Sequence, residues 1–441
     1  MAELTNKEIR KLLSGREELE GQDHIYARYR INPSTGLTFE NAASKLLAVV
    51  TLRTMSCLNY DTIDDRIRVA GRVTVVDSGT GLVEIAIPAS MCSDIEGLTH
   101  LFTLITSAAE YSYADAFWLE SIEIPRIITG RLNGPVLGVR GIRRELDVSS
   151  RPILGLICKP PINGEESKFF EQVNQAIEGG VDLIVDDLLM VAPVGNFSLS
   201  SRVHKFCQIV RNYNNKNRGK RKVGYIVNLG MSPFRALENL DSILSNGVFG
   251  VMLNSFTMGF GSIEEFRQRI GGRCAIFCTN MGSGVISRSV GPKQTGVSEA
   301  VFAKLSRLAG ADAVHTGTSA SECYGTDAWG PASRSLDSVI SGIEKSFAVA
   351  EGDISVANLW ENIKSLGADL IIEPTTGIFN YPDGPYQGAR SFRSMLDMLS
   401  PDMSDSEAHN QIQKRALSDS SLRKGLSAFG YKGISNQRYG D

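Results

Sequence analysis

From about residue 152 onward, short apolar runs alternate regularly with charged segments of helical spacing. The runs are rich in β-branched residues and have the length of strands that are buried on both faces. A regular strand–helix alternation predicts a parallel sheet, and eight such units predict a closed (β/α)8 barrel. The eight expected strands cover 153–160, 181–187, 223–230, 248–255, 274–280, 311–317, 346–352 and 368–374.

The first 148 residues lack this regular alternation and mix strand-like with helical segments. Half-buried strands are expected where apolar and polar residues alternate, at 23–31, 71–78 and 81–88. The segment that follows Ser93 has the spacing of an amphipathic helix. We therefore expect an α/β protein with an N-terminal α+β domain of ferredoxin-like type over 1–148. A (β/α)8 TIM barrel with a helical C-terminal tail is expected over 149–441.

The composition is that of an ordinary globular protein, with 42% hydrophobic and 22% charged residues among 441. The net charge of -3 gives no reason to expect a nucleic acid or a membrane surface as a partner. The basic cluster at 212–224 precedes an expected strand, so we interpret it as a solvated connector. The first residues carry no apolar signal core, and no stretch reaches the ~18 apolar residues that span a bilayer. We expect a cytoplasmic protein.

The seven cysteines are odd in number and scattered, which indicates free thiols in a reducing compartment. Cys274 and Cys278 lie four residues apart on one expected strand, which is too far for shared chelation, so we expect core positions. Surface or structural roles are expected for the histidines at 24, 100, 204 and 409.

Polar residues gather where the expected barrel strands end, and in (β/α)8 barrels catalytic residues come from these ends. Asp186 and Asp187 form a pair of the kind that holds a metal or moves a proton. Adjacent strand residues point to opposite sides, so only one of the two can face the barrel mouth. The strand-end candidates are Lys159, Asp186, Asp187, Asn228, Asn254, Thr279, Asn280, His315, Glu351, Asp353 and Glu373.

Several motifs resemble the large chain of ribulose-bisphosphate carboxylase, RuBisCO. The family's first barrel strand is similar to LGLICKPPIN (154–163), and its second to AIEGGVDLIVDD (176–187). Its sixth strand is similar to LAGADAVHTGT (308–318), and its eighth-strand loop to LIIEPTTGIFNYPDGP (370–385). The resemblance implies the same two-domain fold. It also implies a homodimer or a larger oligomer, in which the partner's N-terminal domain closes the barrel mouth.

The resemblance places the family's magnesium site at the end of the second barrel strand. The family's ligands there are a carbamylated lysine, an aspartate and a glutamate, which correspond to Val185, Asp187 and Leu188. Valine cannot carry a carbamate, and Asp187 alone would hold magnesium weakly. By the family register Asp187 faces the mouth and Asp186 supports it from behind. We therefore expect at most a weak metal site at Asp187, with Asp186 as the lesser candidate.

The family also clamps two substrate phosphates with cations and glycine amides. This chain has other residues at several of these positions. Glu322 stands where the family has a loop lysine, and Asp353 where it has a glycine. The remaining replacements are Thr375 and Thr376 in place of two glycines, Asn280 in place of an arginine and Thr279 in place of a histidine. A phosphate dianion facing Glu322 and Asp353 would be repelled, so we expect neither bisphosphate binding nor carboxylation. Thr375, Thr376 and Gly377 can still donate hydrogen bonds to an anion, which leaves a monophosphate open.

The chain is thus identified as a divergent RuBisCO-like protein of form IV, a group in which some members enolise or isomerise sugar phosphates. We hypothesise proton abstraction next to a carbonyl of a small sugar, sugar acid or sugar monophosphate, with Lys159 and His315 as proton carriers. Asp187 would orient Lys159 or hold a weak metal, although the ion pair would also weaken the lysine as a base. The alternative is a non-catalytic binding or regulatory protein on the same scaffold.

New acids surround the expected mouth. If half of them point inward, the pocket suits a neutral polyol, a cationic ligand or a differently placed metal. Otherwise they are solvated loop acids on an idle scaffold. These acids are Glu322, Glu351, Asp353 and Glu373. The expected substrate-binding residues are Asn228, Thr279, Asn280, Glu322, Glu351, Asp353, Thr375, Thr376 and Gly377.

Overall fold

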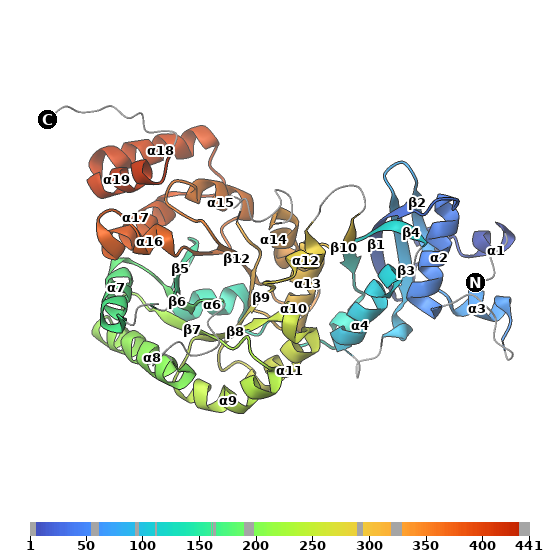
Figure 1. The fold of residues 1–441 in the computed structure, drawn as a ribbon, viewed down its shortest axis with the longest axis horizontal. Helices are drawn as coiled ribbons and strands as arrows, with labels where there is room; N and C mark the ends of the chain where they lie inside the picture. The colour runs from blue at the N-terminus through green and yellow to red at the C-terminus, as the bar shows by residue number, and fades with distance from the viewer. Residues whose placement is uncertain are drawn as a thin grey trace.

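A computed structural model shows two domains side by side, a small sheet domain and a larger barrel (Figure 1). The residues that the structure describes are 6–53, 61–92, 97–110, 113–159, 161, 165–188, 198–288, 294–318 and 329–431. The ferredoxin-like domain and the TIM barrel expected from the sequence are both confirmed.

The N-terminal domain is a sheet of strand order β10-β4-β1-β3-β2. Its elements are α1 (Asn6–Lys11), β1 (His24–Pro33), α2 (Phe39–Leu52), α3 (Ile63–Val69), β2 (Arg72–Asp77), β3 (Leu82–Pro88), α4 (Gly97–Thr106), β4 (Ala114–Glu123) and α5 (Arg126–Thr129). Along β1, Ala27 and Tyr29 are buried in the core while Arg28 and Arg30 lie on the other face. This alternation follows from the two-residue period of a strand and gives a sheet with one buried face.

The polar face of this sheet is held by a buried acid. The Glu84 side chain is fully buried and forms ion pairs with Arg16 at 2.6 Å and Arg28 at 2.7 Å. Thr74 donates a further hydrogen bond to the same carboxylate. Burial alone would raise the pKa of Glu84, but the hydrogen bonds from these three residues outweigh it and lower the pKa to about 2. Glu84 therefore ties three segments of the domain together.

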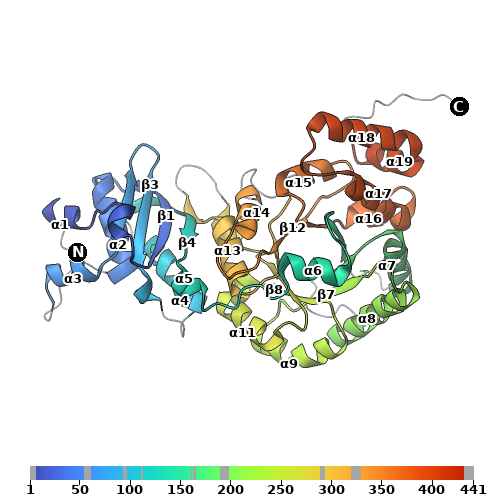
Figure 2. The same ribbon diagram turned by 180° about the vertical axis from the view of Figure 1, so that it is seen from behind.

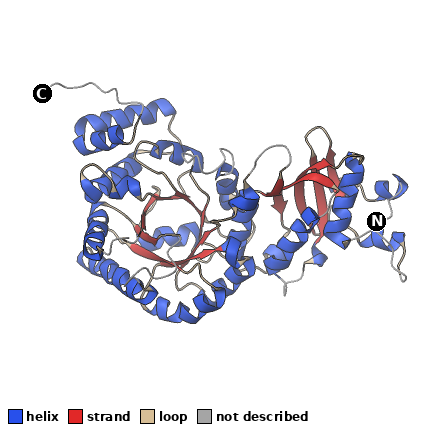
Figure 3. Ribbon diagram, viewed as in Figure 1, coloured by secondary structure: helices blue, strands red, loops and turns tan. Residues whose placement is uncertain are grey.

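Eight parallel strands close the barrel in the order β11-β12-β13-β5-β6-β7-β8-β9 (Figure 3). The strands are β5 (Ile153–Cys158), β6 (Leu183–Asp186), β7 (Gly224–Asn228), β8 (Gly250–Asn254), β9 (Ala275–Thr279), β11 (Ala313–His315), β12 (Phe347–Glu351) and β13 (Leu370–Glu373). Each lies within one of the eight apolar runs. The sequence prediction of the barrel strands is thus confirmed.

The helices form a ring around these strands (Figure 2). They are α7 (Glu166–Gly179), α8 (Leu199–Lys216), α9 (Pro233–Ser245), α10 (Ser255–Met258), α11 (Phe260–Ile270), α12 (Gly284–Ser287), α13 (Glu299–Ala309), α14 (Trp329–Asp337), α15 (Leu359–Leu366), α16 (Thr376–Phe379) and α17 (Gly384–Met398). The expected helical tail consists of α18 (Asp405–Ser418) and α19 (Ser420–Ala428). Among the described helices, none is both long and apolar enough to cross a membrane.

One helix closes the amino-terminal end of the barrel. Helix α6 (Gly138–Leu146) lies across the barrel in Figure 1, and its Val139 and Ile142 belong to the same core cluster as the inward-facing strand residues. Although it precedes residue 148, α6 therefore packs with the barrel. With this end filled by hydrocarbon, only the carboxyl ends of the strands remain for chemistry, as in other TIM barrels.

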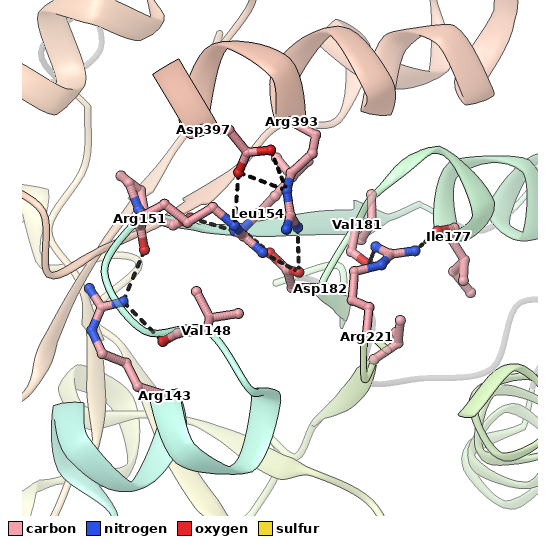
Figure 4. Close-up of polar contacts among 12 residues, drawn as sticks. Arg143, Val148, Arg151, Leu154, Ile177, Val181, Asp182, Arg221, Arg393 and Asp397 are labelled. Carbon is pink, nitrogen blue, oxygen red and sulfur yellow. Dashed lines mark hydrogen bonds and ion pairs between the residues drawn. The ribbon is translucent and has the colours of Figure 1, made fainter. Parts of the chain in front are cut away.

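Two buried aspartates fasten that end of the barrel. Asp182, just before β6, accepts hydrogen bonds from Arg151 and Arg393 and from the backbone N–H of Leu154 in β5 (Figure 4). Asp312 lies just before β11, which is four barrel strands further along the chain, and takes the corresponding place there. It accepts from the guanidinium of Arg267 and from backbone N–H groups of β9 and of the segment before α6.

The two domains share a sheet. The short strand β10 (Thr295–Val297) comes from the barrel half of the chain but pairs in parallel with β4 of the N-terminal sheet. Lys304 of α13 reaches the same strand and donates to the carbonyl oxygen of Ile122 at 2.6 Å. Burial lowers the pKa of Lys304. The expected N-terminal domain over 1–148 is therefore completed by a strand from beyond its boundary.

The cysteines and the basic segment can also be placed. All five described cysteines are buried thiols, including Cys274 and Cys278. Most of the basic segment 212–224 lies at the end of α8 and the turn before β7. One of its residues, Arg221, donates to the carbonyl oxygens of Val181 and Ile177 (Figure 4), so it anchors the connector to the barrel.

Candidate active site

Three inward-facing side chains meet at the carboxyl ends of three adjacent barrel strands. His315 ends β11, Glu351 ends β12 and Glu373 ends β13. The His315 Nε2 atom lies 3.0 Å from Glu373 Oε2 and 4.0 Å from Glu351 Oε2. All three side chains are buried. Strand pairing brings together residues that are 22 to 58 positions apart in the sequence.

The two carboxylates control the charge of His315. Burial alone would lower the pKa of this imidazole, but the neighbouring Glu351 and Glu373 outweigh it and raise the pKa to about 9. The other ring nitrogen, Nδ1, lies 3.2 Å from the carbonyl oxygen of Cys278 in β9. Both ring nitrogens are therefore engaged, and His315 lies inside a buried cluster of ionisable side chains.

Glu351 is the member of the cluster that also interacts with the charged pair Lys159 and Asp187. Burial raises its pKa to about 7 against the opposing charge of His315, and the carboxylates of Glu373 and Asp187 act in the same direction as burial. The Lys159 ammonium lowers the pKa of Glu351. Lys159 and Asp187 are thus close enough to Glu351 to influence its charge.

Glu373 is the most deeply buried acid of the site. Its side chain has no solvent exposure, and one of its oxygens, Oε1, lacks a hydrogen-bond partner among the described residues. The side chain occupies the space above Gly155 of β5, where a Cβ atom would lie 2.8 Å from Glu373 Cγ. A glycine in the neighbouring strand thus makes room for this carboxylate.

Lys159 and Asp187 follow β5 and β6 at the outer mouth. Their charged atoms, Lys159 Nζ and Asp187 Oδ2, are 3.8 Å apart. The lysine side chain is 66% exposed, whereas the aspartate is 18% exposed. Both residues therefore lie at the carboxyl ends of neighbouring barrel strands. The exposure leaves the lysine amine largely solvated.

Asp186 points to the opposite side of the strand. Its carboxylate is fully buried and accepts from Arg202 at 2.9 Å, from the Tyr225 hydroxyl at 2.9 Å and from the backbone N–H of Asn228 at 3.0 Å. Burial raises the pKa of Asp186 against the opposing charge of Arg202. Both oxygens are occupied by partners outside the mouth, so Asp186 supports β6 and is not available to a metal there.

Three expected substrate-binding residues serve the loops instead. Asn228 donates to the carbonyl oxygens of Asp187 and Leu188, and Thr279 accepts from the backbone N–H of Met281. Asn280 donates to Glu299, whose pKa is raised by burial. The same Glu299 carboxylate accepts from the serines at 283 and 287. The sequence analysis missed Glu299. Its partners lie in the preceding loop, and a serine followed by a glutamate is typical of the start of a helix.

The remaining expected residues lie at the rim. Asp353 is exposed and has a left-handed backbone with φ 47°, so it does not join the buried acids. Thr375 is half-buried and Thr376 exposed at the start of α16, whereas Gly377 is buried and a Cβ there would lie 2.3 Å from the carbonyl oxygen of Ile354. Gly377 thus has a packing role. Glu322 lies outside the described residues.

Comparison with known proteins identifies the scaffold. Residues 138–429 match the model of the ribulose bisphosphate carboxylase large chain, catalytic domain. The chain belongs to the RuBisCO large-chain family. This confirms the family and the fold that the motifs of the barrel half indicated.

Curated RuBisCO relatives span both domains at low identity. A ribulose bisphosphate carboxylase of Pyrococcus furiosus is 25% identical over 420 residues, which cover 93% of this chain and 95% of the relative. A ribulose bisphosphate carboxylase-like protein of Archaeoglobus fulgidus is 26% identical over 323 residues, with 73% and 72% covered. Relatives of both kinds therefore match at similar identity.

Solved archaeal RuBisCO structures share the fold. The octameric RuBisCO of Pyrococcus horikoshii, in complex with a sulfate ion, superimposes with a TM-score of 0.82 at 22% identity and covers 96% of this chain and 97% of its own. The dimeric RuBisCO of Hyperthermus butylicus gives 0.81 at 21% identity, with 96% and 100% covered. At this identity the likeness shows the architecture alone.

Proposed function

We propose that this chain is a RuBisCO-like protein without carboxylase activity, which moves a proton next to a carbonyl of a small sugar, sugar acid or sugar monophosphate. The observation that carries the proposal is the position of Lys159. It stands at the mouth beside Asp187, next to a buried histidine–carboxylate cluster, while hydrocarbon occupies the neighbouring metal positions. A positioned side chain that transfers a proton supplies roughly 10²–10⁴-fold in rate.

The end of β6 does not fit the magnesium site that the resemblance implies. Val185 has no solvent exposure and packs in the barrel interior with Ile157 and Leu183, and Leu188 packs against the same cluster. Neither side chain offers an oxygen, and Asp187 is the remaining inward-facing carboxylate on this strand. The proposed reaction therefore has no step that depends on a metal ion at the end of β6.

Lys159 would take the proton at Nζ from the hydroxyl-bearing carbon next to the carbonyl, which leaves an enediolate. The protonated amine would return the proton to the former carbonyl carbon while the hydroxyl proton passes to the former carbonyl oxygen, so that the carbonyl moves by one carbon. The distance of 3.8 Å between Lys159 Nζ and Asp187 Oδ2 is longer than a hydrogen bond, so the aspartate holds the amine near the mouth without a short contact. Among the described side chains of the site, Lys159 and His315 are the cationic groups, and His315 is already paired with Glu373, so few cations remain for two phosphates. A substrate with at most one phosphate fits this balance.

The test measures exchange of carbon-bound hydrogen for deuterium in D2O by NMR, across sugars, sugar acids and their monophosphates. We expect exchange with at least one compound and a loss of about 100-fold or more in Lys159→Met at an unchanged melting temperature. Lys168→Met is the matched control, because Lys168 is 67% exposed and lies 3.7 Å from Glu165 in an equivalent ion pair on α7.

Two results would overturn the proposal. Exchange with no compound, or equal exchange in Lys159→Met and the control, would favour the non-catalytic alternative. Fixation of labelled CO2 onto ribulose bisphosphate in the presence of magnesium would contradict the claim that carboxylation is absent.

We also propose that the chain assembles as a homodimer. The RuBisCO structures that share its fold include a dimer and an octamer, and the proposed site would then be closed by the partner's N-terminal domain. Light scattering coupled to size-exclusion chromatography tests this directly. A monomer at micromolar concentration would refute it.

A further inference from the structure

We propose that His315, Glu351 and Glu373 bind one divalent transition-metal ion deep in the barrel mouth. The site would lie on β11, β12 and β13, whereas the family resemblance places a metal at β6. Its role as a Lewis acid rests on the proposed function, but metal binding itself does not.

The three side chains have the spacing of a ligand set. One ligand atom from each lies within 4.8 Å of the other two. Bonds of about 2.0–2.2 Å to imidazole nitrogen and carboxylate oxygen place neighbouring ligand atoms about 3–3.5 Å apart. The observed 3.0 Å and 4.0 Å separations around His315 Nε2 bracket that range. Small side-chain rotations would therefore complete the coordination.

His315 is oriented as a metal ligand would be. A carbonyl oxygen can only accept, so the contact between His315 Nδ1 and the Cys278 carbonyl oxygen requires the hydrogen on Nδ1. In the neutral imidazole this leaves the Nε2 lone pair directed at the two carboxylates. Metal-binding histidines are commonly fixed in this way by a hydrogen bond from the second nitrogen to a backbone carbonyl.

Glu373 carries a second, independent sign of a missing ligand. Its Oε1 atom is buried and lacks a hydrogen-bond partner among the described residues. Buried polar atoms are nearly always partnered, and a carboxylate oxygen without a donor is costly in a protein interior. Oε1 lies on the side of Gly155, 3.5 Å from where a Cβ of that residue would be, whereas Oε2 faces His315. A cation bound to both oxygens of the Glu373 carboxylate would satisfy Oε1. Gly155 preserves the room that the Glu373 side chain needs.

The donor set also indicates the kind of ion. One imidazole nitrogen with two carboxylates suits Mn²⁺, Fe²⁺, Co²⁺ or Zn²⁺, whereas magnesium and calcium favour oxygen ligands alone. Among the described residues, the ion-pair partner of both Glu351 and Glu373 is His315, and neither acid forms an ion pair with a lysine or an arginine. Three protein ligands leave further positions open, as in catalytic metal sites. A substrate carbonyl oxygen could occupy one of them.

The test titrates Mn²⁺ into the full-length, chelator-treated protein without substrate and follows the free ion by electron paramagnetic resonance. We expect one bound ion per chain. Glu351→Gln and Glu373→Gln should each weaken binding by at least about 100-fold, since even residues that only support a ligand cost about 10–100-fold. The melting temperature without metal verifies that each variant is folded. If one of the two variants does not fold, the other still tests the site.

Asp187→Asn is the discriminating control, because it removes the carboxylate at the family's metal position. Retained Mn²⁺ binding in this variant, together with its loss in Glu351→Gln and Glu373→Gln, supports the proposal. No binding to the wild-type chain, or binding lost in Asp187→Asn and kept in the glutamine variants, overturns it. Because no substrate is present, failure of the hydrogen-exchange assay would leave this result unchanged.

Discussion

The two aspartates at the amino-terminal end of the barrel differ in a way that predicts unequal effects of the same substitution. Asp312 is the ionic partner of Arg267, whose side chain is 1% exposed. The Asp312→Asn substitution removes the negative charge and leaves a buried guanidinium without its counter-ion. Breaking a buried pair by removing one partner costs ~3–5 kcal/mol. The substitution also replaces one of the accepting carboxylate oxygens by an NH2 group, which would face the N–H groups that now donate to Asp312.

Asp182 provides the matched case. Its partners Arg151 and Arg393 have side chains that are 11% and 28% exposed, and both retain Asp397 as a second acid. Water and Asp397 can therefore compensate for the charge that Asp182→Asn removes. The expected loss is ~1.5–3 kcal/mol, the range for hydrogen bonds to charged groups.

Urea unfolding of both variants and the wild-type protein, followed by circular dichroism, measures the difference. Asp312→Asn should have the lower midpoint at an unchanged slope. Calorimetric melting should give the same order. Equal losses, or the larger loss in Asp182→Asn, would refute the idea that the solvent access of the orphaned arginine sets the cost.

The other predictions concern the N-terminal sheet and the rim. Because the pKa of Glu84 is lowered to about 2 from its usual 4.5, its stabilising effect is complete above pH ~4.5 and disappears as pH falls through ~2. Glu84→Gln should lower the free energy of unfolding by on the order of 2 kcal/mol at pH 6, because the partly exposed arginines reduce the effect. The urea midpoints of the variant and the wild-type protein should converge near pH 2. A difference between the two midpoints that stays constant with pH would contradict this. Gly377→Ala should lose ~1–3 kcal/mol by overpacking against Ile354, measured by melting; an unchanged melting temperature would exclude that contact.

The barrel could be predicted because each strand is a compact apolar run bounded by helical segments. Fully buried strands are apolar on both faces, however, so the runs do not reveal which residues point inward. At β6 the adjacent pair had to face opposite sides, and the family register indicated that Asp187 is the inward one, as the structure shows. At the other strands the inward phase became visible only in the folded barrel.

The buried cluster shows that contacts between distant strand-end residues cannot be predicted from one sequence. His315, Glu351 and Glu373 were each recognisable as strand-end residues, but their contact depends on the register between β11, β12 and β13. Asn280 gave the opposite result: its position after β9 suggested a ligand contact, and its side chain instead binds Glu299. Position at a strand end thus identifies candidates, and long-range pairing decides among them.

The pairing of β10 with β4 has a consequence for how the chain folds as it is made. Folding generally begins at the N-terminus during synthesis, yet the last strand of the N-terminal sheet ends at Val297. Until that point is reached, the β4 edge is open, and an open edge is a template for pairing with other chains. The nascent chain must therefore keep one edge of its first domain from foreign strands until about two thirds of the 441 residues have been joined.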